Sequence, residues 1–486
     1  MSATLDADRW NGRVFSGGWR SAAGGVYSLA EPATGIPLGE VGQAAPADIR
    51  AAAQKARAAQ PAWAASPLAE RAGVFRKAAA FIEANRDAIT EWVVRETGSV
   101  PAKAGFEIMV VLGELHEAAA MVTQPRGVLL PSNADTTSIA RRVPHGVVGV
   151  ISPFNFPMIL SIRAVAPALA TGNAVILKPD PQTPVSGGLI FARAFEEAGL
   201  PADILHVLPG DAAVGEALIT DPDVAMISFT GSTPVGRRVG ALAGERLKKV
   251  SLELGGKNSL IVLDDADVDL AVSNAAWGSF LHQGQICMST GRHLVHRKIA
   301  KEFIEKLAAK ADHLPVGDPF REKVALGPLI NQRQVDRVDA IVRDSVKAGA
   351  VLKAGGSATK LFYRPTVLAE VAPGMRAFEE EIFGPVAPIT VFADEAEAVR
   401  LANATDFGLS TGIITASVTR GMQLAAQVRT GLVHINDQTV NDEPWAPFGG
   451  FGASGNGARH GGPANWDEFT QWQWVTMKHT APRYPF

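Results

Sequence analysis

The sequence predicts an α/β protein, with a doubly wound parallel sheet, a second α/β unit after it and a small β arm. Short, continuous runs rich in β-branched residues, such as residues 146–151, are typical of strands buried on both faces. Segments with helical spacing separate these runs, and the alternation starts again after Gly256. Alternating strands and helices favour a parallel sheet, whose ligand-binding loops lie at the carboxyl ends of its strands.

Length and composition limit the classes of protein that the chain can be. Its 486 residues exceed the usual size of one core, so we expect two or three domains. The net charge of −3 argues against binding to nucleic acid or to an anionic membrane. The apolar stretches 146–153 and 164–177 are interrupted by Gly or Pro and are too short to cross a bilayer. Residues 1–10 lack the pattern of a signal peptide and the chain has one cysteine, so we expect a cytoplasmic protein.

The first half of the chain supplies the elements of the first sheet. Residues 47–120 favour helices, because strong helix formers and apolar positions at helical spacing fill them. Thr183 and Pro184 resemble an N-cap and a first-turn proline, and Gly199 a helix stop. The strands expected here are 146–151, 174–177, 204–208, 225–229 and 250–252, and the helices between them are 158–170, 184–198 and 234–246.

The second half repeats the alternation and ends in an arm. We expect helices over 265–280 and 300–311, and strands over 294–296, 387–392 and 431–435. The aromatic segment 469–475 and residues 136–143 together suggest a hairpin arm that pairs with another subunit. The domains expected are therefore 1–122 with 145–254, then 255–455, and an arm of 123–144 with 465–486.

The only cysteine, Cys287, lies in a glycine-containing loop, and Glu253 precedes a Gly-Gly turn upstream of it. A thiol and a carboxylate in two such loops can serve as nucleophile and base. Each residue alone is a weak signal, because lone cysteines are more often small buried hydrophobes and most surface glutamates are solvated. We predict no catalytic metal, because no CxxC occurs and zincin spacing is absent among His282, His293, His296, His434 and His460.

Asn155 stands between two aromatics that are themselves bounded by prolines. Its freedom is limited, so the side-chain amide is a possible preorganised donor to an oxyanion. A turn asparagine that satisfies local backbone groups is the commoner reading of such a residue.

Two more segments follow predicted strands and are suited to anions. In residues 228–236, Gly231 allows close backbone approach and Ser232 can donate to a phosphate at a helix start. A plain βα turn is an equal alternative, because the G-x-G-x-x-G spacing is absent. Lys178 directly follows strand 174–177 and can reach a ribose or phosphate, or else be a solvated lysine at the rim.

Taken together, seven segments in order along almost the full chain resemble the NAD(P)-dependent aldehyde dehydrogenase superfamily. They are Pro153-Phe-Asn-Phe-Pro157, Lys178-Pro179, Phe229-Thr-Gly-Ser-Thr233, Leu252-Glu-Leu-Gly-Gly256, Gly284-Gln-Ile-Cys287, Glu381-Ile-Phe-Gly-Pro385 and Pro447-Phe-Gly-Gly450. Finer features are similar to the benzaldehyde dehydrogenase branch: Lys178-Pro-Asp-Pro-Gln-Thr183, Phe280-Leu-His-Gln-Gly284, His434-Ile-Asn-Asp-Gln438 and the ending Tyr484-Pro-Phe486.

The resemblance implies a reaction sequence. The Cys287 thiolate attacks the aldehyde carbon to form a thiohemiacetal, while the Asn155 amide and the Cys287 backbone N–H hold the oxyanion. Hydride passes to the nicotinamide and leaves a thioester, and Glu253 then activates water for hydrolysis to the acid. A CoA-acylating member generally lacks this glutamate. A non-catalytic relative, such as a lens crystallin, would not need all three residues.

The resemblance also implies NAD as the cofactor. Lys178 would contact the adenosine ribose, Ser232 the pyrophosphate and Glu381 the nicotinamide ribose. Pro181 stands where many NAD-preferring members carry a ribose-binding glutamate, so NADP is a second possible cofactor. The chain reads Asn456-Gly-Ala-Arg459 where some members have a second glutamate, so we assign no second base. The residues expected at the cofactor are Lys178, Ser232, Gly231, Gly236, Glu381, Phe383, Pro153 and Ile151.

An apolar, aromatic lining is expected for the substrate pocket, and it favours a flat aldehyde. Arg163 could serve a ring hydroxyl or a carboxylate, although a structural ion pair is the favoured role. Benzaldehyde, salicylaldehyde and vanillin stay as alternatives, with a semialdehyde as a further one, and the family's habit suggests a homodimer or homotetramer. The residues expected in the pocket are Phe156, Leu160, Arg163, Ile286, Met288, Trp445 and Phe448.

Overall fold

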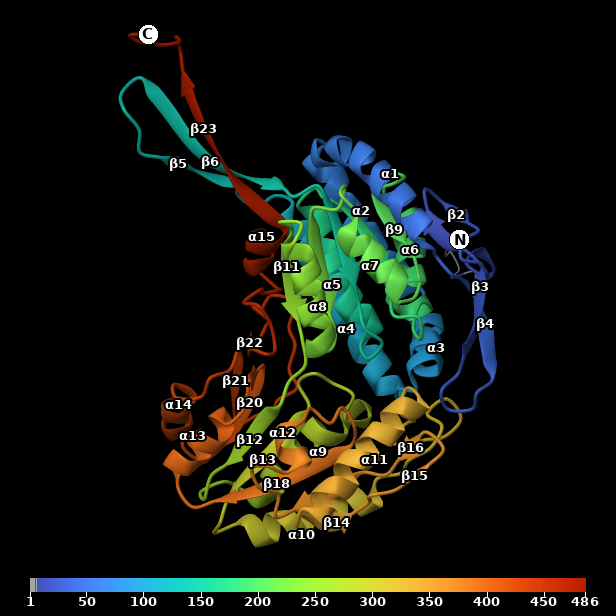
Figure 1. The fold of residues 1–486 in the computed structure, drawn as a ribbon, viewed down its shortest axis with the longest axis vertical. Coiled ribbons are helices and arrows are strands. Elements are labelled where there is room, and N and C mark those ends of the chain that lie inside the picture. The colour runs from blue at the N-terminus through green and yellow to red at the C-terminus, as the bar shows by residue number, and fades with distance from the viewer. Residues whose placement is uncertain (1–4, 6) are drawn as a thin grey trace.

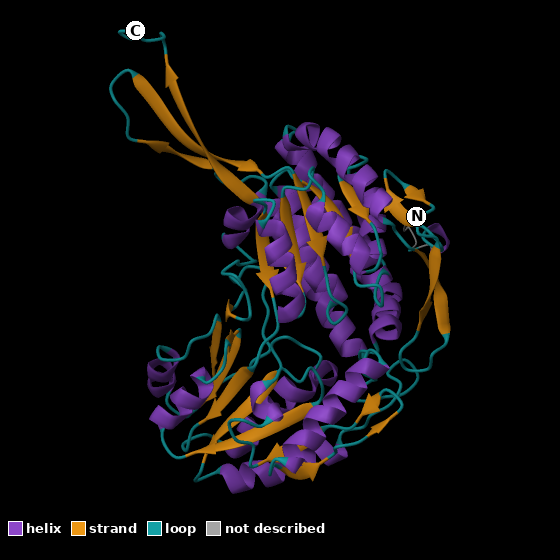
Figure 2. Cartoon of the chain, in the orientation of Figure 1, coloured by secondary structure: helices purple, strands orange, loops and turns teal. Residues whose placement is uncertain are grey.

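The computed structural model describes residue 5 and residues 7–486, and it has the α/β fold that the sequence predicts (Figure 1). Residues 1–4 and 6, within the segment where no signal peptide is expected, lie outside the described residues. Two units, each built on a seven-stranded sheet, make up the body, and a β arm projects from the first unit (Figures 1 and 2).

The first sheet has the strand order β11-β10-β7-β8-β9-β1-β2. The chain runs outward from β7 to β8 and β9, then returns to β10 on the other side of β7. In sheets that reverse in this way, ligands bind at the carboxyl ends of the strands beside the reversal. The five predicted strands are confirmed and parallel: β7 Val147–Ile151, β8 Ala174–Lys178, β9 Leu205–Val207, β10 Met226–Thr230 and β11 Lys249–Glu253. Two short antiparallel strands at one edge were not predicted: β1 Val14–Ser16 and β2 Trp19–Arg20.

Helices cover both faces of this sheet (Figure 2). Their apolar faces form one continuous core with the strands, and α5 is buried along its whole length. The expected helices are confirmed with slightly shifted ends: α1 Pro46–Ala64, α2 Leu68–Ala84, α3 Arg86–Thr97, α4 Pro101–Met121, α5 Pro157–Ala170, α6 Ile190–Glu197 and α8 Thr233–Gly244. One more helix is α7, Ala212–Thr220. Its N-cap is Asp211, whose carboxylate accepts hydrogen bonds from the first turn.

The expected N-cap at Thr183 is wrong. The helical run starts with a π-helical turn, Val185–Leu189, and the Thr183 hydroxyl is buried with no hydrogen-bond partner among the described residues. Glu96 of α3 takes over the capping, since its carboxylate accepts from the backbone N–H groups of Val185 and Ser186 at 2.8 and 2.7 Å. Gly199, with φ of 79°, ends the run as predicted.

The second sheet has the order β14-β17-β18-β13-β12-β20-β21, parallel except at β14. The three predicted strands are confirmed with shifted ends: β13 Thr290–His296, β18 Val386–Phe392 and β21 Leu432–Ile435. The other strands are β12 Asn258–Val262, β14 Val351–Ala354, β17 Thr366–Ala369 and β20 Ser410–Ile414. The flanking helices are α9 Val268–Phe280, α10 Ala300–His313, α11 Gln332–Lys347, α12 Arg376–Glu379, α13 Glu395–Asn403 and α14 Val418–Ala425.

The arm is a three-stranded sheet instead of the expected hairpin. Strand β6, Thr136–Pro144, pairs along its full length with β23, Thr470–Lys478, and on its other side with β5, Gly127–Leu130. Large apolar side chains stay exposed on the arm, among them Trp474 at 72% and Leu129 at 77%. Such a surface is typical of a face that another chain covers.

The remaining elements are small. No helix of the described chain is long and apolar enough to cross a membrane. A separate apolar cluster at the junction of the two units contains Phe156, Ile286, Met288 and Phe448, and Cys287 packs against it. The small elements are β3 Val26–Ala30, β4 Pro37–Gly42, β15 Ala358–Thr359, β16 Phe362–Tyr363, β19 Phe407–Gly408, β22 Phe451–Gly452, α15 Ala464–Phe469 and the 3-10 turns Ala7–Arg9 and Leu281–Gly284.

Candidate active site

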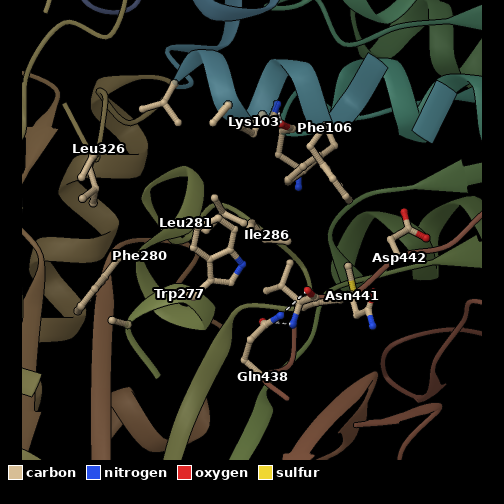
Figure 3. Close-up of a pocket in the computed structure, with 18 of the residues that line it drawn as sticks. Lys103, Phe106, Trp277, Phe280, Leu281, Ile286, Leu326, Gln438, Asn441 and Asp442 are labelled. Atoms are coloured by element: carbon tan, nitrogen blue, oxygen red, sulfur yellow. Dashed lines mark hydrogen bonds between the residues drawn. The ribbon is translucent and has the colours of Figure 1, made fainter. Parts of the chain in front are cut away.

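A cavity of about 890 Å³ lies where the two units meet. Lys103 and Phe106 of α4 lie on one side, and Trp277 and Leu281 lie across from them (Figure 3). Its walls are mostly apolar, and few polar groups converge on it, as in pockets for small molecules. Both Cys287 and Asn155 line this cavity, so the fold brings together two of the three residues expected to carry the chemistry.

The loop that carries Cys287 is held in one conformation. Its entry is left-handed, with φ of 47° at His282, 55° at Gln283 and 66° at Gly284. A Cβ at Gly284 would lie 2.2 Å from a backbone oxygen, so this close approach requires glycine. On the far side, the Asn258 amide donates to the carbonyl oxygen of Cys287 at 2.8 Å. The half-buried thiol therefore has a fixed position in the cavity wall.

Asn155 belongs to the turn between β7 and α5. Its side-chain Nδ2 donates to the carbonyl oxygen of Gln285 at 2.9 Å, two residues before Cys287. This bond links the first unit to the loop of the second and aims the amide at the region of the thiol. One N–H of the amide remains for a substrate oxygen.

Glu253 ends β11 and is buried, with 3% of its surface exposed. Neither carboxyl oxygen has a hydrogen-bond partner among the described residues. Burial raises the pKa of Glu253 well above its usual value, and Arg163 and Arg459 act in the opposite direction. An orphaned, desolvated carboxyl of this kind is a functional candidate, because its burial is otherwise a cost.

Burial also raises the pKa of the Cys287 thiol, to about 12. The neighbouring carboxyl of Glu381 adds to this rise, whereas Arg163 opposes it. The resting thiol is therefore protonated at neutral pH, and the reactive thiolate is a minor species.

The pH dependence of alkylation tests this state. Because thiolate is the attacking form, the rate at which iodoacetamide labels Cys287 should rise about tenfold per pH unit between about pH 7 and 9. No other cysteine competes, so mass spectrometry of the whole chain reads the one site. A plateau below pH 8 would contradict a raised pKa, and Cys287→Ala supplies the unlabelled control.

The anion-binding groups gather at the carboxyl ends of β7, β8 and β10. Ser232 is the N-cap of α8, and its side chain makes no capping bond, so the first N–H groups of the helix are available to an anion. A Cβ would meet the Phe229 ring at 2.6 Å at Gly231, and the Leu254 side chain at 2.3 Å at Gly236. A side chain at either position would displace these neighbours, so the turn and the start of the helix lie close against the sheet.

Lys178 lies at the end of β8 and is almost fully buried. Burial lowers the pKa of its amine, and the carboxylates of Asp180 and Asp211 oppose this change. The lysine is thus not the solvated rim residue of the alternative interpretation. Ile151 and Pro153 lie at the end of the neighbouring strand, so the residues present fit the adenosine end of a dinucleotide.

Glu381 and Phe383 lie on the opposite side, in the loop before β18. One Glu381 oxygen accepts from the Gly256 backbone N–H at 3.0 Å, and burial raises the pKa of Glu381 to about 7. Phe383 has a φ of 57° and packs edge-on against Phe154, with ring centroids 5.9 Å apart. A bulky residue in the left-handed region is uncommon and marks a locally enforced geometry.

Six of the seven residues expected in the substrate pocket line the cavity: Phe156, Leu160, Arg163, Ile286, Met288 and Phe448. Trp445 does not, and this expectation is corrected. It is 60% exposed. Its turn packs backbone against Gly461 and Gly462, which turns the side chain outward. The sequence reasoning missed Phe106, Trp277, Phe280, Leu281 and Leu326 in the lining, although an aromatic on an otherwise polar helix face, as at Trp277, is a usable signal.

Arg163 makes the expected ion pair. Its guanidinium pairs with Asp442, lies 3.9 Å from Glu114 and stacks 4.3 Å from the centroid of the Phe448 ring. Burial raises the pKa of Glu114 to about 8. Arg163 thus stabilises an aromatic wall of the cavity and is already paired.

No cluster of three or more potential metal ligands occurs in the part of the chain that the structure describes.

A model of the Aldehyde dehydrogenase family matches residues 19–475. The chain is 56% identical to a vanillin dehydrogenase of Amycolatopsis sp. over 483 residues, 99% of each protein. It is 50% identical to a benzaldehyde dehydrogenase [NAD(+)] of Pseudomonas putida over 487 residues, 100% of both.

Among solved structures, a salicylaldehyde dehydrogenase from Pseudomonas putida G7, complexed with salicylaldehyde, has the same fold. The TM-score is 0.94 at 36% identity, covering 98% of this chain and 99% of that one. Family model, sequence relatives and structure agree over nearly the whole length. The chain belongs to the aldehyde dehydrogenase family.

Proposed function

We propose that this protein oxidises an aromatic aldehyde to its carboxylic acid, with NAD as hydride acceptor and water as acyl acceptor. The observation that carries the proposal is the shared cavity, where Cys287 and the Asn155 amide face apolar, aromatic walls. Glu253, buried and without a partner in the described structure, supplies the base.

The chain's own residues perform the steps as follows. The Cys287 thiol releases its proton to water, its sulfur bonds to the aldehyde carbon, and the Asn155 Nδ2–H and the Cys287 backbone N–H stabilise the oxygen that becomes negative. NAD, when bound, supplies the hydride acceptor. Glu253 then takes a proton from water, whose oxygen attacks the thioester and releases the acid. The apolar walls exclude bulk water from the reacting centre during the first step.

The cofactor would lie across the carboxyl ends of the first sheet. We place Lys178 at the adenosine ribose, Gly231, Ser232 and Gly236 at the pyrophosphate, and Ile151 and Pro153 beneath. Glu381 would hold the nicotinamide ribose, with Phe383 beside it. The benzaldehyde dehydrogenase of Pseudomonas putida carries NAD(+) in its name, which supports NAD for this chain. Because Pro181 supplies no carboxylate to repel the 2′-phosphate of NADP, we keep NADP as a second cofactor, expected to be used less well than NAD.

The substrate class rests on the cavity and on the relatives. Flat rings pack well between aromatic walls such as Phe156 and Phe448. The relatives are named for vanillin, benzaldehyde and salicylaldehyde, which share an aryl aldehyde. A carboxylate-bearing semialdehyde is disfavoured, because the Arg163 guanidinium already pairs with the Asp442 carboxylate.

Turnover of an aldehyde panel tests this function. Benzaldehyde, vanillin and salicylaldehyde should each give reduced cofactor at 340 nm, with kcat/KM about tenfold or more above short aliphatic aldehydes and succinate semialdehyde. Each is assayed with NAD and with NADP, and NAD should be preferred. Faster turnover of the semialdehyde than of every aryl aldehyde would refute the proposed substrate class.

We also propose the assembly and the location. The domains would comprise residues 1–122 with 145–254, and 255–455, with an oligomerisation arm of 123–144 and 465–486. The exposed apolar side chains on β5 and β23 fit pairing into a homodimer or homotetramer. One cysteine and no disulfide suit the reducing cytoplasm.

A further inference from the structure

A buried ion pair on α4 lies at the cavity wall, where Lys103 lines the cavity. Lys103 and Glu107 are one helical turn apart, their charged groups are paired, and their side chains are 1% and 0% exposed. Two charges in an apolar wall are costly unless each also makes good hydrogen bonds. The pair makes such bonds, to the turn that carries Asn155 and to the first turn of α5 that follows it.

Lys103 holds the turn at its beginning. Its Nζ donates to the backbone carbonyl oxygen of Asn155 at 2.8 Å and lies 4.3 Å from the centroid of the Phe156 ring. The same amine therefore fixes the backbone of the oxyanion donor and the ring of an aromatic wall.

Glu107 holds the turn at its end. Its Oε1 pairs with Lys103, and its Oε2 accepts hydrogen bonds from the backbone N–H groups of Met158 and Ile159, at 3.0 and 3.3 Å. These groups open α5, whose own N-cap residue, Phe156, makes no side-chain capping bond. Glu107 thus caps α5 from another helix, and the negative charge suits the positive end of the helix dipole.

Asn155 itself lies outside any helix or strand, between β7 and α5. Its side chain reaches across to the cysteine loop through the 2.9 Å bond to the Gln285 carbonyl oxygen. The direction of the amide accordingly depends on where the backbone of the turn is held. Oxyanion stabilisation is sensitive to this direction, because the donor acts at hydrogen-bond distance.

We propose that Lys103 and Glu107 are positioning residues for the oxyanion site, which act on the reaction through Asn155. The proposal rests on the function proposed above, in which Asn155 donates to the aldehyde oxygen. The charge pair contacts residues 155–159 at both ends, so α4 fixes the position of the backbone that carries the Asn155 amide.

The test is a double-mutant cycle in the full-length chain. Lys103→Met with Glu107→Gln removes both charges, keeps both shapes and leaves an oxygen to cap α5. We expect this variant to form reduced cofactor about tenfold more slowly in a single turnover of benzaldehyde, with the aldehyde KM changed less than about twofold. Combined with Asn155→Ala, the same change should cost less than about twofold, because its target is already absent.

Two further variants separate positioning from general stability. Lys103→Arg keeps a cationic donor and should recover most of the lost rate. Glu96→Gln is the matched control, since Glu96 is also a fully buried carboxylate that caps a helical run from another helix, but it does not line the cavity. It should lower the melting temperature without changing the single-turnover rate at saturating NAD.

An equal loss in the parent and Asn155→Ala backgrounds would overturn the proposal, as would an undiminished rate in a folded double variant. If the parent enzyme turns over no aryl aldehyde, the proposed function fails first. That outcome is seen before any variant is made, so the two failures are distinct.

Discussion

Cys287→Ala is expected to abolish aldehyde oxidation, with a fall of about 10⁴-fold or more in kcat, because no other thiol exists to form the acyl intermediate. The side chain lies in a wall formed by Ile286, Met288 and Phe448, so alanine leaves a small apolar gap and no unpaired polar group. The fold and the cofactor cleft should therefore persist.

The measurement is reduced-cofactor formation in both single and multiple turnover. The control is the Kd for NAD, measured from the quenching of protein fluorescence. It should be unchanged within about twofold, because the adenosine end of the proposed site lies on the first sheet. Cys287→Ser is a second control, since a hydroxyl keeps the size but is a much weaker nucleophile. Full activity in either variant would mean that another residue attacks the aldehyde.

Glu253→Gln should separate the two halves of the reaction. We expect a burst of about one equivalent of reduced cofactor per site, followed by a steady rate lowered by about 10²–10⁴-fold, because water must attack without a base. Glutamine keeps the volume of the side chain and, unlike a carboxylate, buries no charge. The variant is thus expected to be as stable as the parent protein or more stable.

The pH profile follows from the direction of the pKa shift. The pKa of Glu253 is raised by burial, so the carboxylate that accepts the proton from water is lost as the pH falls through this raised value. Deacylation in the parent enzyme should therefore slow toward acid at a pH well above the usual range of a glutamate, and the variant should lose this dependence.

Hydroxylamine provides the control for this variant. It attacks a thioester without a protein base, so it should restore turnover in Glu253→Gln to near the burst rate. A full steady-state rate in the variant without hydroxylamine would exclude Glu253 as the deacylation base. Absence of a burst would instead place the residue in the first half of the reaction.

The strands and helices of both units were largely predictable, because burial on two faces demands continuous apolar runs and amphipathic helices demand spaced ones. Runs such as Val147–Ile151 carry this signal in their own residues. The short strand Val14–Ser16, second from the edge of its sheet, and the arm strand Gly127–Leu130 carry little of it, since such short strands form where a neighbouring strand offers free hydrogen-bonding groups. Their pairing is a property of the tertiary fold.

For the candidate site, too, some features were predictable from the local sequence and others depend on the tertiary fold. The residues that the sequence singles out include Cys287 and Asn155, which share one cavity, and Gly231 and Gly236, where the backbone lies close to its neighbours. The position of Trp445 was not predictable, since an apolar residue near the site can face either way and the packing of its turn decides. Glu96 in place of Thr183 as a cap, and Lys103 behind Asn155, depend on contacts between helices far apart in the chain.

The 2.9 Å bond between Asn155 Nδ2 and the Gln285 carbonyl oxygen joins two bodies that each possess their own hydrophobic core. In the proposed reaction the donor would belong to one body and the nucleophile to the other, so neither half would be a catalyst by itself. Aldehyde turnover would then report whether the two bodies are correctly docked against each other, which spectroscopic measurements of helix or strand content do not detect.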